Sequence, residues 1–312
     1  MQINWNEYVL RYTEPGGKIY YIIRRADSLV GLFSNYIVFA GHIRYALANG
    51  WLPVIDMKNY PNTLLEPRLL GKLNAWEYYF CQPFNITLDE AYNARNVIMG
   101  SGDVRNPFPS GHNSIGYYNN VGNVLNDWRM LVKLGMLRIQ PKILEDIMEE
   151  YNRLISKEDR VLGTLVRGTD YVALRPMHHS VQPPVEAVID TARKLLEQWK
   201  CNKIFLATED FNIVNRFKEA FKDKCIVTDR QYIKYDGRAH LGFYHINREN
   251  DYFLLGKEYL TQMVILSKCN CLLTSMCSGA AGMMMMADGF EQAVVFDLGK
   301  YGVSPVITPP QQ

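Results

Sequence analysis

Short apolar runs alternate with stretches of helical periodicity along most of the chain. In the clearest run, residues 161–166, four β-favouring apolar side chains lead directly into the polar turn Arg167-Gly168-Thr169-Asp170. Further strands are predicted at residues 18–24, 52–57, 97–100, 203–207, 225–228, 270–273 and 293–297. Helices are predicted at residues 36–48, 126–135, 141–157, 183–200, 212–221, 254–266 and 280–287. Strands that alternate with helices indicate an α/β fold with parallel sheets covered on both faces.

A charged segment at residues 157–160 separates a predicted helix from the strand at 161–166, and we expect the junction of two domains there. The expected domains are residues 1–157 and 158–312, each of ordinary domain size. Residues 58–84 are rich in proline, asparagine and aromatics, which predicts an irregular insertion. Its aromatics either pack beneath a solvated loop or belong to a surface that faces an acceptor.

Composition narrows the class of protein. With 48% hydrophobic and 21% charged residues, the chain should bury a substantial core, and a net charge of +2 gives no reason to expect nucleic-acid binding. The first fifteen residues lack the pattern of a signal peptide, and polar residues and glycines interrupt the uncharged run at 269–287. The six cysteines form no C-x-x-C pair, which favours buried thiols over a zinc site. We therefore expect a cytoplasmic protein without a metal site or an integral membrane segment.

Three predicted strands end in polar segments that should meet at one edge of the C-terminal sheet. The segments contain Arg167 and Asp170, then Thr208, Glu209 and Asp210, then Thr274, Ser275, Ser278 and Gly279. The guanidinium of an arginine can bind phosphate through two parallel hydrogen bonds. Gly168 would let a ligand come close to the backbone, and a helix start rich in Gly and Ser would add amide donors. The carboxylates could bind sugar hydroxyls, so the pattern indicates a nucleotide diphosphate pocket. The alternatives are an Arg–Asp pair that braces a loop, and Ser275 or Ser278 as a helix N-cap.

Four segments resemble motifs of the α1,2-, α1,6- and protein O-fucosyltransferases, in the same order along the chain. VRGTDY is similar to the H-x-R-R-x-D motif of that superfamily, and IFLATED resembles its strand ending in A-T-D-D. LSKCNCLLTSMCSGAAGMMM resembles the region around T-F-S-S that holds the donor phosphates. Near the start, GLFSN at residues 31–35 is similar to the G-x-F/G-x-N/Q turn after the first strand. Together the four matches span most of the chain.

The resemblance implies a GT-B architecture, with two Rossmann-like domains facing a cleft. The N-terminal domain would take the acceptor, and the C-terminal domain would take GDP-fucose as donor, with inversion at the anomeric carbon and no metal or other cofactor. Arg167 would neutralise the β-phosphate of departing GDP. Asn35 would close over the pyrophosphate or the acceptor. The donor-binding residues implied are Gly31, Phe33, Arg167, Gly168, Thr208, Glu209, Asp210, Gln262, Ser275, Cys277, Ser278 and Gly279.

The chain also departs from the family pattern. Leu165 replaces the histidine of the first motif, Gly168 replaces its second arginine, and Cys277 replaces one serine of the phosphate loop. Gln262 stands where α1,6-enzymes carry an acidic residue that helps hold the guanosine. The motifs therefore indicate phosphate binding more strongly than they indicate which nucleotide base is bound.

The catalytic base stays open. Arg175 falls where some α1,6-family members carry a glutamate base. Asp170, His178 and His179 are the local candidates, and an imidazole suits proton transfer near neutral pH. A further alternative is that the leaving phosphate takes the proton of the acceptor hydroxyl. His178 and His179 could also be a solvated pair in a loop.

We therefore expect a fucosyltransferase that acts on a glycan acceptor in bacterial surface polysaccharide synthesis. A lipid-linked acceptor would bring such an enzyme to the membrane as a peripheral protein. Two alternatives are the same fold with another nucleotide sugar, and a non-catalytic protein that binds a nucleotide or a glycan. A dinucleotide-dependent oxidoreductase is disfavoured because no G-x-G-x-x-G follows any predicted strand.

Overall fold

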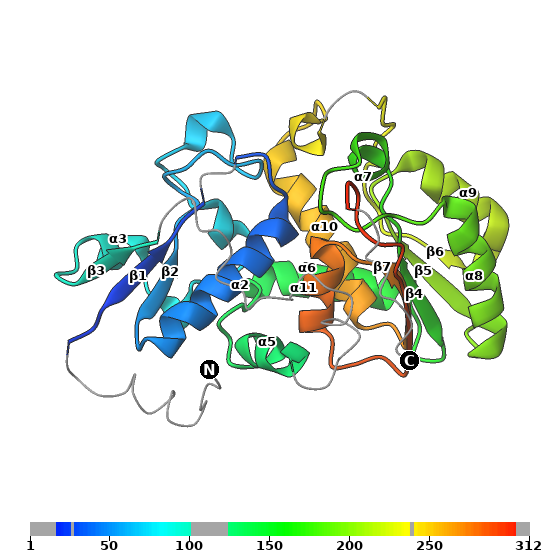
Figure 1. The fold of residues 1–312 in the computed structure, drawn as a ribbon, viewed down its shortest axis with the longest axis horizontal. Coiled ribbons are helices and arrows are strands. Elements are labelled where there is room, and N and C mark those ends of the chain that lie inside the picture. The colour runs from blue at the N-terminus through cyan, green and yellow to red at the C-terminus, as the bar shows by residue number, and fades with distance from the viewer. Residues whose placement is uncertain (1–16, 26–27, 101–123, 238–239, 304–312) are drawn as a thin grey trace, which may run out of the picture. The chain divides into compact units, whose positions relative to one another are not determined.

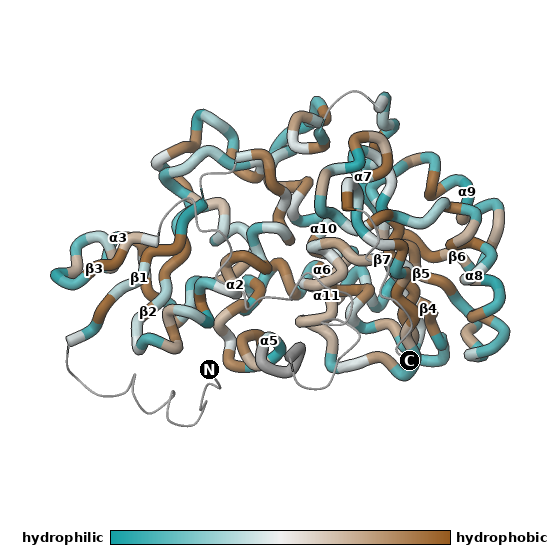
Figure 2. Tube along the Cα trace, viewed as in Figure 1, coloured by the Kyte–Doolittle hydropathy of each residue, from teal (hydrophilic) through white to brown (hydrophobic). Residues whose placement is uncertain are grey.

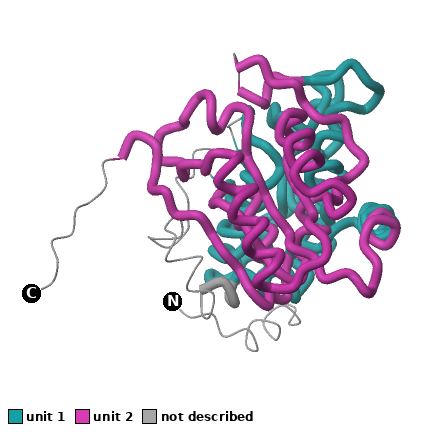
Figure 3. Tube along the Cα trace, turned by 90° about the vertical axis from the view of Figure 1, so that its right-hand side faces the viewer, with its two compact units in different colours: residues 1–149, 245–260 teal, residues 150–244, 261–312 magenta. Residues whose placement is uncertain are grey.

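A computed structural model describes residues 17–25, 28–100, 124–237 and 240–303. The chain divides into two compact units, coloured separately in Figure 3. Unit 1 comprises residues 1–149 and 245–260, and unit 2 comprises residues 150–244 and 261–312. The domain boundary after residue 157 stays a prediction. The opening residues, on which the expectation of no signal peptide rests, lie outside the described part of the chain.

Unit 1 contains a parallel three-stranded sheet in the order β2-β1-β3 (Figure 1). Its strands are β1 (Tyr20–Ile23), β2 (Leu52–Ile55) and β3 (Val97–Met99). Its helices are α2 (Leu32–Ala48), η1 (Pro67–Leu69), η2 (Ala75–Tyr78), η3 (Pro83–Asn85), α3 (Leu88–Tyr92), α5 (Val124–Lys133) and most of α6 (Pro141–Leu154). Helix α2 begins four residues earlier than predicted, because Leu32 and Phe33 continue its buried face.

Aromatic side chains of the segment 58–84 pack inside unit 1. The rings of Trp76 and Phe80 stack with centroids 4.4 Å apart, and both side chains are fully buried. The Tyr79 hydroxyl donates to the carbonyl of Phe253 at 2.9 Å. A Cβ on Gly256 would lie 2.4 Å from the Tyr79 ring, so only glycine fits there. Of the two alternatives, packing beneath a loop therefore holds for these aromatics.

Unit 2 contains a parallel five-stranded sheet in the order β6-β5-β4-β7-β8. Its strands are β4 (Val161–Leu165), β5 (Lys203–Ala207), β6 (Cys225–Ile226), β7 (Cys271–Ser275) and β8 (Gln292–Phe296). Its helices are α7 (Thr169–Leu174), α8 (Val185–Gln198), α9 (Phe211–Phe221), η4 (Lys222–Lys224), η5 (Leu241–Phe243), the second part of α10 (Asp251–Ser267) and α11 (Ser278–Met286). Because β4 has β5 on one side and β7 on the other, the strand order reverses at the β4/β7 pair, as in a Rossmann fold.

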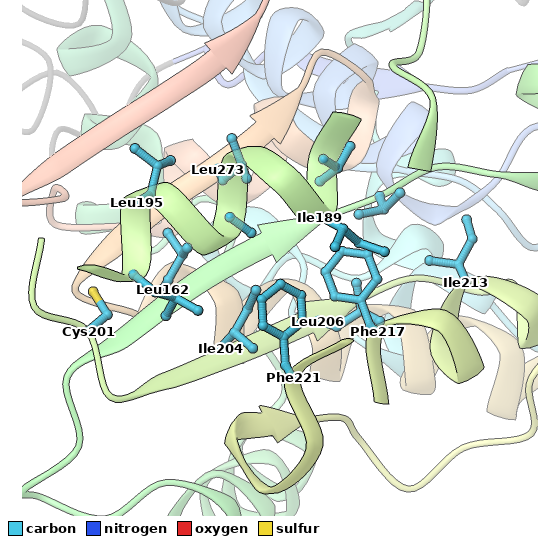
Figure 4. Close-up of a cluster of buried hydrophobic side chains, with 14 of the residues drawn as sticks. Leu162, Ile189, Leu195, Cys201, Ile204, Leu206, Ile213, Phe217, Phe221 and Leu273 are labelled. Atoms are coloured by element: carbon cyan, nitrogen blue, oxygen red, sulfur yellow. The ribbon is translucent and has the colours of Figure 1, made fainter. Parts of the chain in front are cut away.

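Helices cover the sheet of unit 2 on both faces, as predicted. On one face, α8 and α9 pack on β4 and β5 through a buried cluster that includes Leu162, Ile189, Ile204 and Phe217 (Figure 4). Figure 2 shows these strands as hydrophobic and the outward turns of both helices as hydrophilic. On the other face, a Cβ on Gly163 would lie 2.5 Å from Leu266, which shows how closely α10 approaches β4.

All six cysteines are free thiols, four of them buried, in agreement with the sequence-based expectation. Within the described residues, no helix is long and apolar enough to cross a membrane.

Candidate functional site

The carboxyl ends of β4, β5 and β7 lie at the same edge of the parallel sheet of unit 2. Arg167 follows β4, Glu209 follows β5, and Ser275 ends β7. The β4/β7 pair is the topological switch point, where open α/β sheets bind ligands. The structure therefore brings the three predicted polar segments to one place.

Arg167 lies between two carboxylates and above an aromatic ring. Its Nη1 lies 3.6 Å from Oε2 of Glu209, and its Nη2 lies 3.5 Å from Oδ1 of Asp170. Its Cζ lies 4.8 Å from the centroid of the Tyr171 ring, a distance typical of a cation–π contact. Both ion pairs are longer than a hydrogen bond, so the carboxylates hold the guanidinium in place without forming bidentate pairs with it.

Thr169 adopts a backbone conformation that is unusual for a β-branched residue, with φ of +48°. Its hydroxyl donates to Oε1 of Glu209 at 2.7 Å, and the side chain is buried. Strained residues of this kind persist where surrounding contacts hold them, and they concentrate at functional sites. The bond to Glu209 is such a contact, and it ties the turn after β4 to the end of β5.

Asp170 is buried and braces a distant loop. Its Oδ2 accepts a hydrogen bond from the amide of Leu241 at 3.1 Å and lies 3.5 Å from Nε2 of His240. Nδ1 of His240 accepts from the amide of Gly242 at 3.0 Å, so the proton of a neutral ring sits on Nε2 and faces Asp170. These contacts favour a bracing role for Asp170 over that of a base.

Gly168 is required for a different reason from the one expected. A Cβ at this position would lie 2.7 Å from Oδ2 of Asp210 and 2.7 Å from Cδ1 of Ile213. The missing side chain therefore makes room for the start of α9, which packs against the turn after β4.

The three polar residues after β5, Thr208, Glu209 and Asp210, make different contacts. The Asp210 side chain caps α9, accepting from the amides of Asn212 at 2.7 Å and Ile213 at 3.3 Å. The Thr208 hydroxyl accepts from the amide of Asp210 at 3.2 Å. The carboxylate of Glu209 lies beside Arg167, so a ligand at the switch point would meet this acid.

The loop after β7 leads into the N-terminus of α11. The Ser275 hydroxyl donates to the side-chain oxygen of Gln182, so its proton is already used within the protein. Cys277 is the N-cap of α11, and its sulfur accepts from the amide of Ala280 at 3.4 Å. Burial raises the pKa of the Cys277 thiol. Arg167 and the amides of the helix start offset only part of this rise. The first turn of α11, with Ser278 and Gly279, is thus the part of this loop best suited to bind a phosphate.

Gln262, expected near the nucleotide base, lies fully buried in α10. Its side-chain nitrogen donates to the carbonyl of Thr208, and its oxygen accepts from Arg230. All of these groups belong to unit 2.

The two histidines near the motif differ in their surroundings. Both are exposed, and the His179 ring meets the edge of Tyr171 at a centroid distance of 5.4 Å. His178 has φ of +66°, and its amide donates to the carbonyl of Tyr301 at 2.9 Å. Arg175, also exposed, ends α7 in a left-handed conformation. The ring of Tyr171 contacts both His179 and Arg167, so His179 is linked to Arg167 through this ring.

In unit 1, the turn at residues 31–35 is the start of α2, with Gly31 as its N-cap. Phe33 is buried against Tyr36 and Tyr259, with ring centroids 5.4 Å and 5.2 Å away, so it serves the core. Asn35 is also buried, and its Oδ1 accepts from Arg25 at 3.4 Å. Within the described residues its amide nitrogen has no hydrogen-bond partner.

Sequence reasoning did not identify Tyr171, Gln182, Arg230 or His240 as site residues. Tyr171 lies within the quoted motif and could have been found there. Gln182 reaches Ser275 across 93 residues, and His240 lies 70 residues from Asp170, so no local pattern signals either contact. Among the described residues, no group of three or more His, Cys, Asp or Glu side chains is arranged to hold a metal ion.

No protein-family model matches the sequence, and no curated protein matches it. Solved structures do match its fold. A structure of NodZ alpha-1,6-fucosyltransferase soaked with GDP-fucose is 14% identical with a TM-score of 0.52, over 92% of this chain and 98% of that chain. A structure of POFUT1 in complex with GDP-fucose is 9% identical with a TM-score of 0.51, over 94% of this chain and 100% of that chain. The chain thus has the α/β fold of the GT-B fucosyltransferases, as its motifs implied.

Proposed function

We propose that the protein is an inverting, metal-independent glycosyltransferase that transfers fucose from GDP-fucose to a glycan acceptor. The observation that carries the proposal is the position of Arg167, which follows β4 at the switch point of the sheet of unit 2. The similarity of the whole fold to structures solved with GDP-fucose supports the choice of donor.

In the proposed reaction, the acceptor hydroxyl attacks the anomeric carbon of fucose from the side opposite GDP. The bond between that carbon and the β-phosphate oxygen breaks, and its electron pair stays on the oxygen. The guanidinium of Arg167 and the amides at the start of α11 would stabilise the growing negative charge. They would thereby supply the positive charge that a divalent cation supplies in metal-dependent transferases.

The remaining residues take supporting roles. Glu209 would bind a hydroxyl of the ribose or of fucose, and Asp170 would hold Arg167 and the loop at Leu241. Of the candidate bases, the contact of His179 with Tyr171 supports His179, because Asp170 is buried and already hydrogen-bonded. Asn35 would contact the pyrophosphate or the acceptor, and the N-terminal domain would take the acceptor.

We further propose that the acceptor belongs to a surface polysaccharide built in the cytoplasm. An acceptor carried on a lipid would place the enzyme at the membrane as a peripheral protein. This proposal about the acceptor is supported by the resemblance of the motifs to those of fucosyltransferases that build bacterial surface polysaccharides.

The test is fucose transfer from GDP-fucose to a panel of glycans in EDTA, with products identified by mass spectrometry and the configuration of the new glycosidic bond determined by NMR. We expect the wild-type protein to form a fucoside of inverted configuration, and Arg167→Lys to lose at least about 100-fold in rate. Arg193→Lys, on the exposed face of α8, is the matched control and should keep full activity. Binding of GDP-fucose without transfer to any glycan would favour a non-catalytic binding protein, and equal rates for wild type and Arg167→Lys would refute the site.

A further inference from the structure

Arg24 lies at the topological switch point of the sheet of unit 1. The strand order β2-β1-β3 places β2 on one side of β1 and β3 on the other, so the order reverses at the β1/β3 pair, where open α/β sheets bind ligands. Arg24 follows β1 directly, and Gly100 follows β3. The Nε of Arg24 donates to the carbonyl of Gly100 at 2.7 Å, so the side chain spans the ends of these two strands.

The Arg24 guanidinium is held in place and still has unbonded N–H groups. Its Nη1 donates to the Tyr60 hydroxyl at 2.6 Å, and its Cζ lies 5.6 Å from the centroid of that ring. This bond and the one to Gly100 use two of the five N–H groups. Within the described residues the other three have no hydrogen-bond partner, and Nη2 is open to solvent. A guanidinium that is already held loses little freedom when it binds a ligand.

The carboxylate beside Arg24, at the end of β2, does not form an ion pair with it. Asp56 is buried, and its Oδ1 accepts from the amides of Lys58 and Asn59 at 2.9 and 3.0 Å. Its Oδ2 accepts from the side chains of Asn59 and Tyr92. Among the described residues Arg24, which is partly buried, has no carboxylate partner. A partly buried cation without such a partner favours a negative group on a ligand.

Tyr92 brings an aromatic ring to the same strand ends. Its hydroxyl donates to Asp56, yet the residue is 41% exposed, so part of the ring faces solvent. Partial burial and the bond to Asp56 raise the pKa of the Tyr92 hydroxyl, and Tyr60 adds to this rise, which indicates that the two tyrosines are neighbours. Aromatic rings beside a few fixed polar groups are typical of small-molecule sites. A sugar ring that packs against a tyrosine here would place a negative substituent at Arg24.

We infer that Arg24 binds an oxyanion of the acceptor, so that the acceptor is an acidic glycan. A sugar carboxylate and the phosphate of a glycosyl phosphate share this chemistry, since both accept paired hydrogen bonds from a guanidinium. A neutral glycan offers hydroxyl groups, which lack the charge attraction of an oxyanion. The inference rests on the proposed function, because it takes the ligand of unit 1 to be the acceptor of fucose.

Fucose transfer in EDTA to pairs of glycans that differ only in charge tests the inference. One arm pairs oligosaccharides of uronic acids with their methyl esters, and the other pairs glycosyl phosphates with the same sugars without phosphate. We expect wild type to prefer the acidic member of one arm by about 10- to 100-fold in kcat/KM for the acceptor. The arm that shows this preference identifies the oxyanion.

Arg24→Ala should lose the preference through a higher KM for the acidic member, and its KM for GDP-fucose should stay that of wild type. Arg24→Lys keeps the charge but not the planar guanidinium, so it should retain only part of the preference. Arg95→Ala is the matched control, because Arg95 is exposed and precedes β3 at the opposite edge of the same sheet. It should change neither KM.

Calorimetric titration of the same pairs, with GDP present to occupy the proposed donor site, separates binding from transfer. If wild type transfers fucose no better to acidic members than to neutral ones, or if Arg24→Ala keeps the full preference, the inference is wrong while the proposed function stands. If acidic members bind, lose affinity in Arg24→Ala and receive no fucose, the anion site stands and the transferase function fails. If no glycan of either arm binds or reacts, both fail.

Discussion

Nη1 of Arg167 lies 3.6 Å from Oε2 of Glu209, so opposite charges join the ends of the neighbouring strands β4 and β5. Asp170 places a second carboxylate 3.5 Å from the same guanidinium. The cluster thus carries one positive and two negative formal charges, and all three side chains are largely buried. A diphosphate at Arg167 has to bind despite the repulsion of these two carboxylates.

Removal of one of these carboxylates should strengthen phosphate binding. Glu209→Gln keeps the shape of the side chain and an acceptor for Thr169, but it removes one negative charge next to Arg167. We expect the affinity for inorganic pyrophosphate, which has no ribose to lose contact with, to rise about 3- to 30-fold at low salt and less at high salt. Glu219→Gln, on the exposed side of α9, is the control. Equal pyrophosphate affinity in Glu209→Gln and wild type would contradict the charge balance described above.

The hydroxyl of Thr169 should stabilise the site more than its methyl group does. Thr169→Val keeps the branched shape but leaves the buried Glu209 carboxylate without its 2.7 Å donor, so we expect the free energy of unfolding to fall by about 1–3 kcal/mol. Thr169→Ser keeps the donor and relieves crowding at φ of +48°, so its stability should match or exceed that of wild type. Urea unfolding of the two variants measures this, and equal stabilities would show that the hydrogen bond contributes nothing.

Gly168 should not tolerate a methyl group. Gly168→Ala would place a Cβ 2.7 Å from Asp210 and Ile213, and we expect a loss of about 1–3 kcal/mol in the free energy of unfolding. Because Ile213→Val removes one of the two clashing atoms, it should restore part of the loss in the double variant. Strict additivity of the two substitutions would mean that the clash with Ile213 is not the cause.

The buried histidine of unit 1 should make the protein less stable in mild acid. Burial, helped by Arg25, lowers the pKa of His42 to about 4, and its Nδ1 lies 2.9 Å from the Tyr21 hydroxyl. Between pH of about 6.5 and 4 the unfolded chain takes up a proton on this histidine that the folded protein does not. The part of the free energy of unfolding that depends on a neutral His42 is therefore fully present above pH of about 6.5 and is lost as the pH falls toward 4. The loss should reach about 3 kcal/mol at most.

His42→Asn, which keeps a hydrogen-bond acceptor but cannot titrate in this range, should flatten the dependence of unfolding free energy on pH between 6.5 and 4. His178→Asn is the control, because His178 is exposed and its left-handed backbone suits asparagine. An unchanged pH profile in His42→Asn would assign the acid sensitivity to other groups.

Local patterns were sufficient for most of the strands and for the long helices. The apolar run at residues 203–207 is bounded by polar residues, and it forms β5 with the predicted ends. The periodic segment at 183–200 forms α8, shorter by two residues at each end. The class of fold follows from such alternation, because buried parallel strands and amphipathic helices have distinct periods.

The details of the site were less accessible from sequence. A polar turn was expected after β4, and the short helix α7 follows instead, starting at the strained Thr169. Asp210 was read as a ligand-binding acid, although an aspartate at the start of a helix is also the signature of an N-cap, which is what the structure shows. Contacts between residues far apart in sequence, such as Ser275 with Gln182, depend on tertiary packing that no local pattern encodes.

The central claim, that the strand ends of unit 2 bind the diphosphate of a nucleotide sugar through Arg167, is tested most directly by calorimetric titration of GDP in EDTA. The comparison is between wild type, Arg167→Lys and the matched control Arg193→Lys. We predict that wild type and the control bind GDP with equal affinity, and that Arg167→Lys binds at least about tenfold more weakly because a lysine cannot form the two-pronged contact. Absence of GDP binding by wild type, or equal affinity of wild type and Arg167→Lys, would contradict the claim.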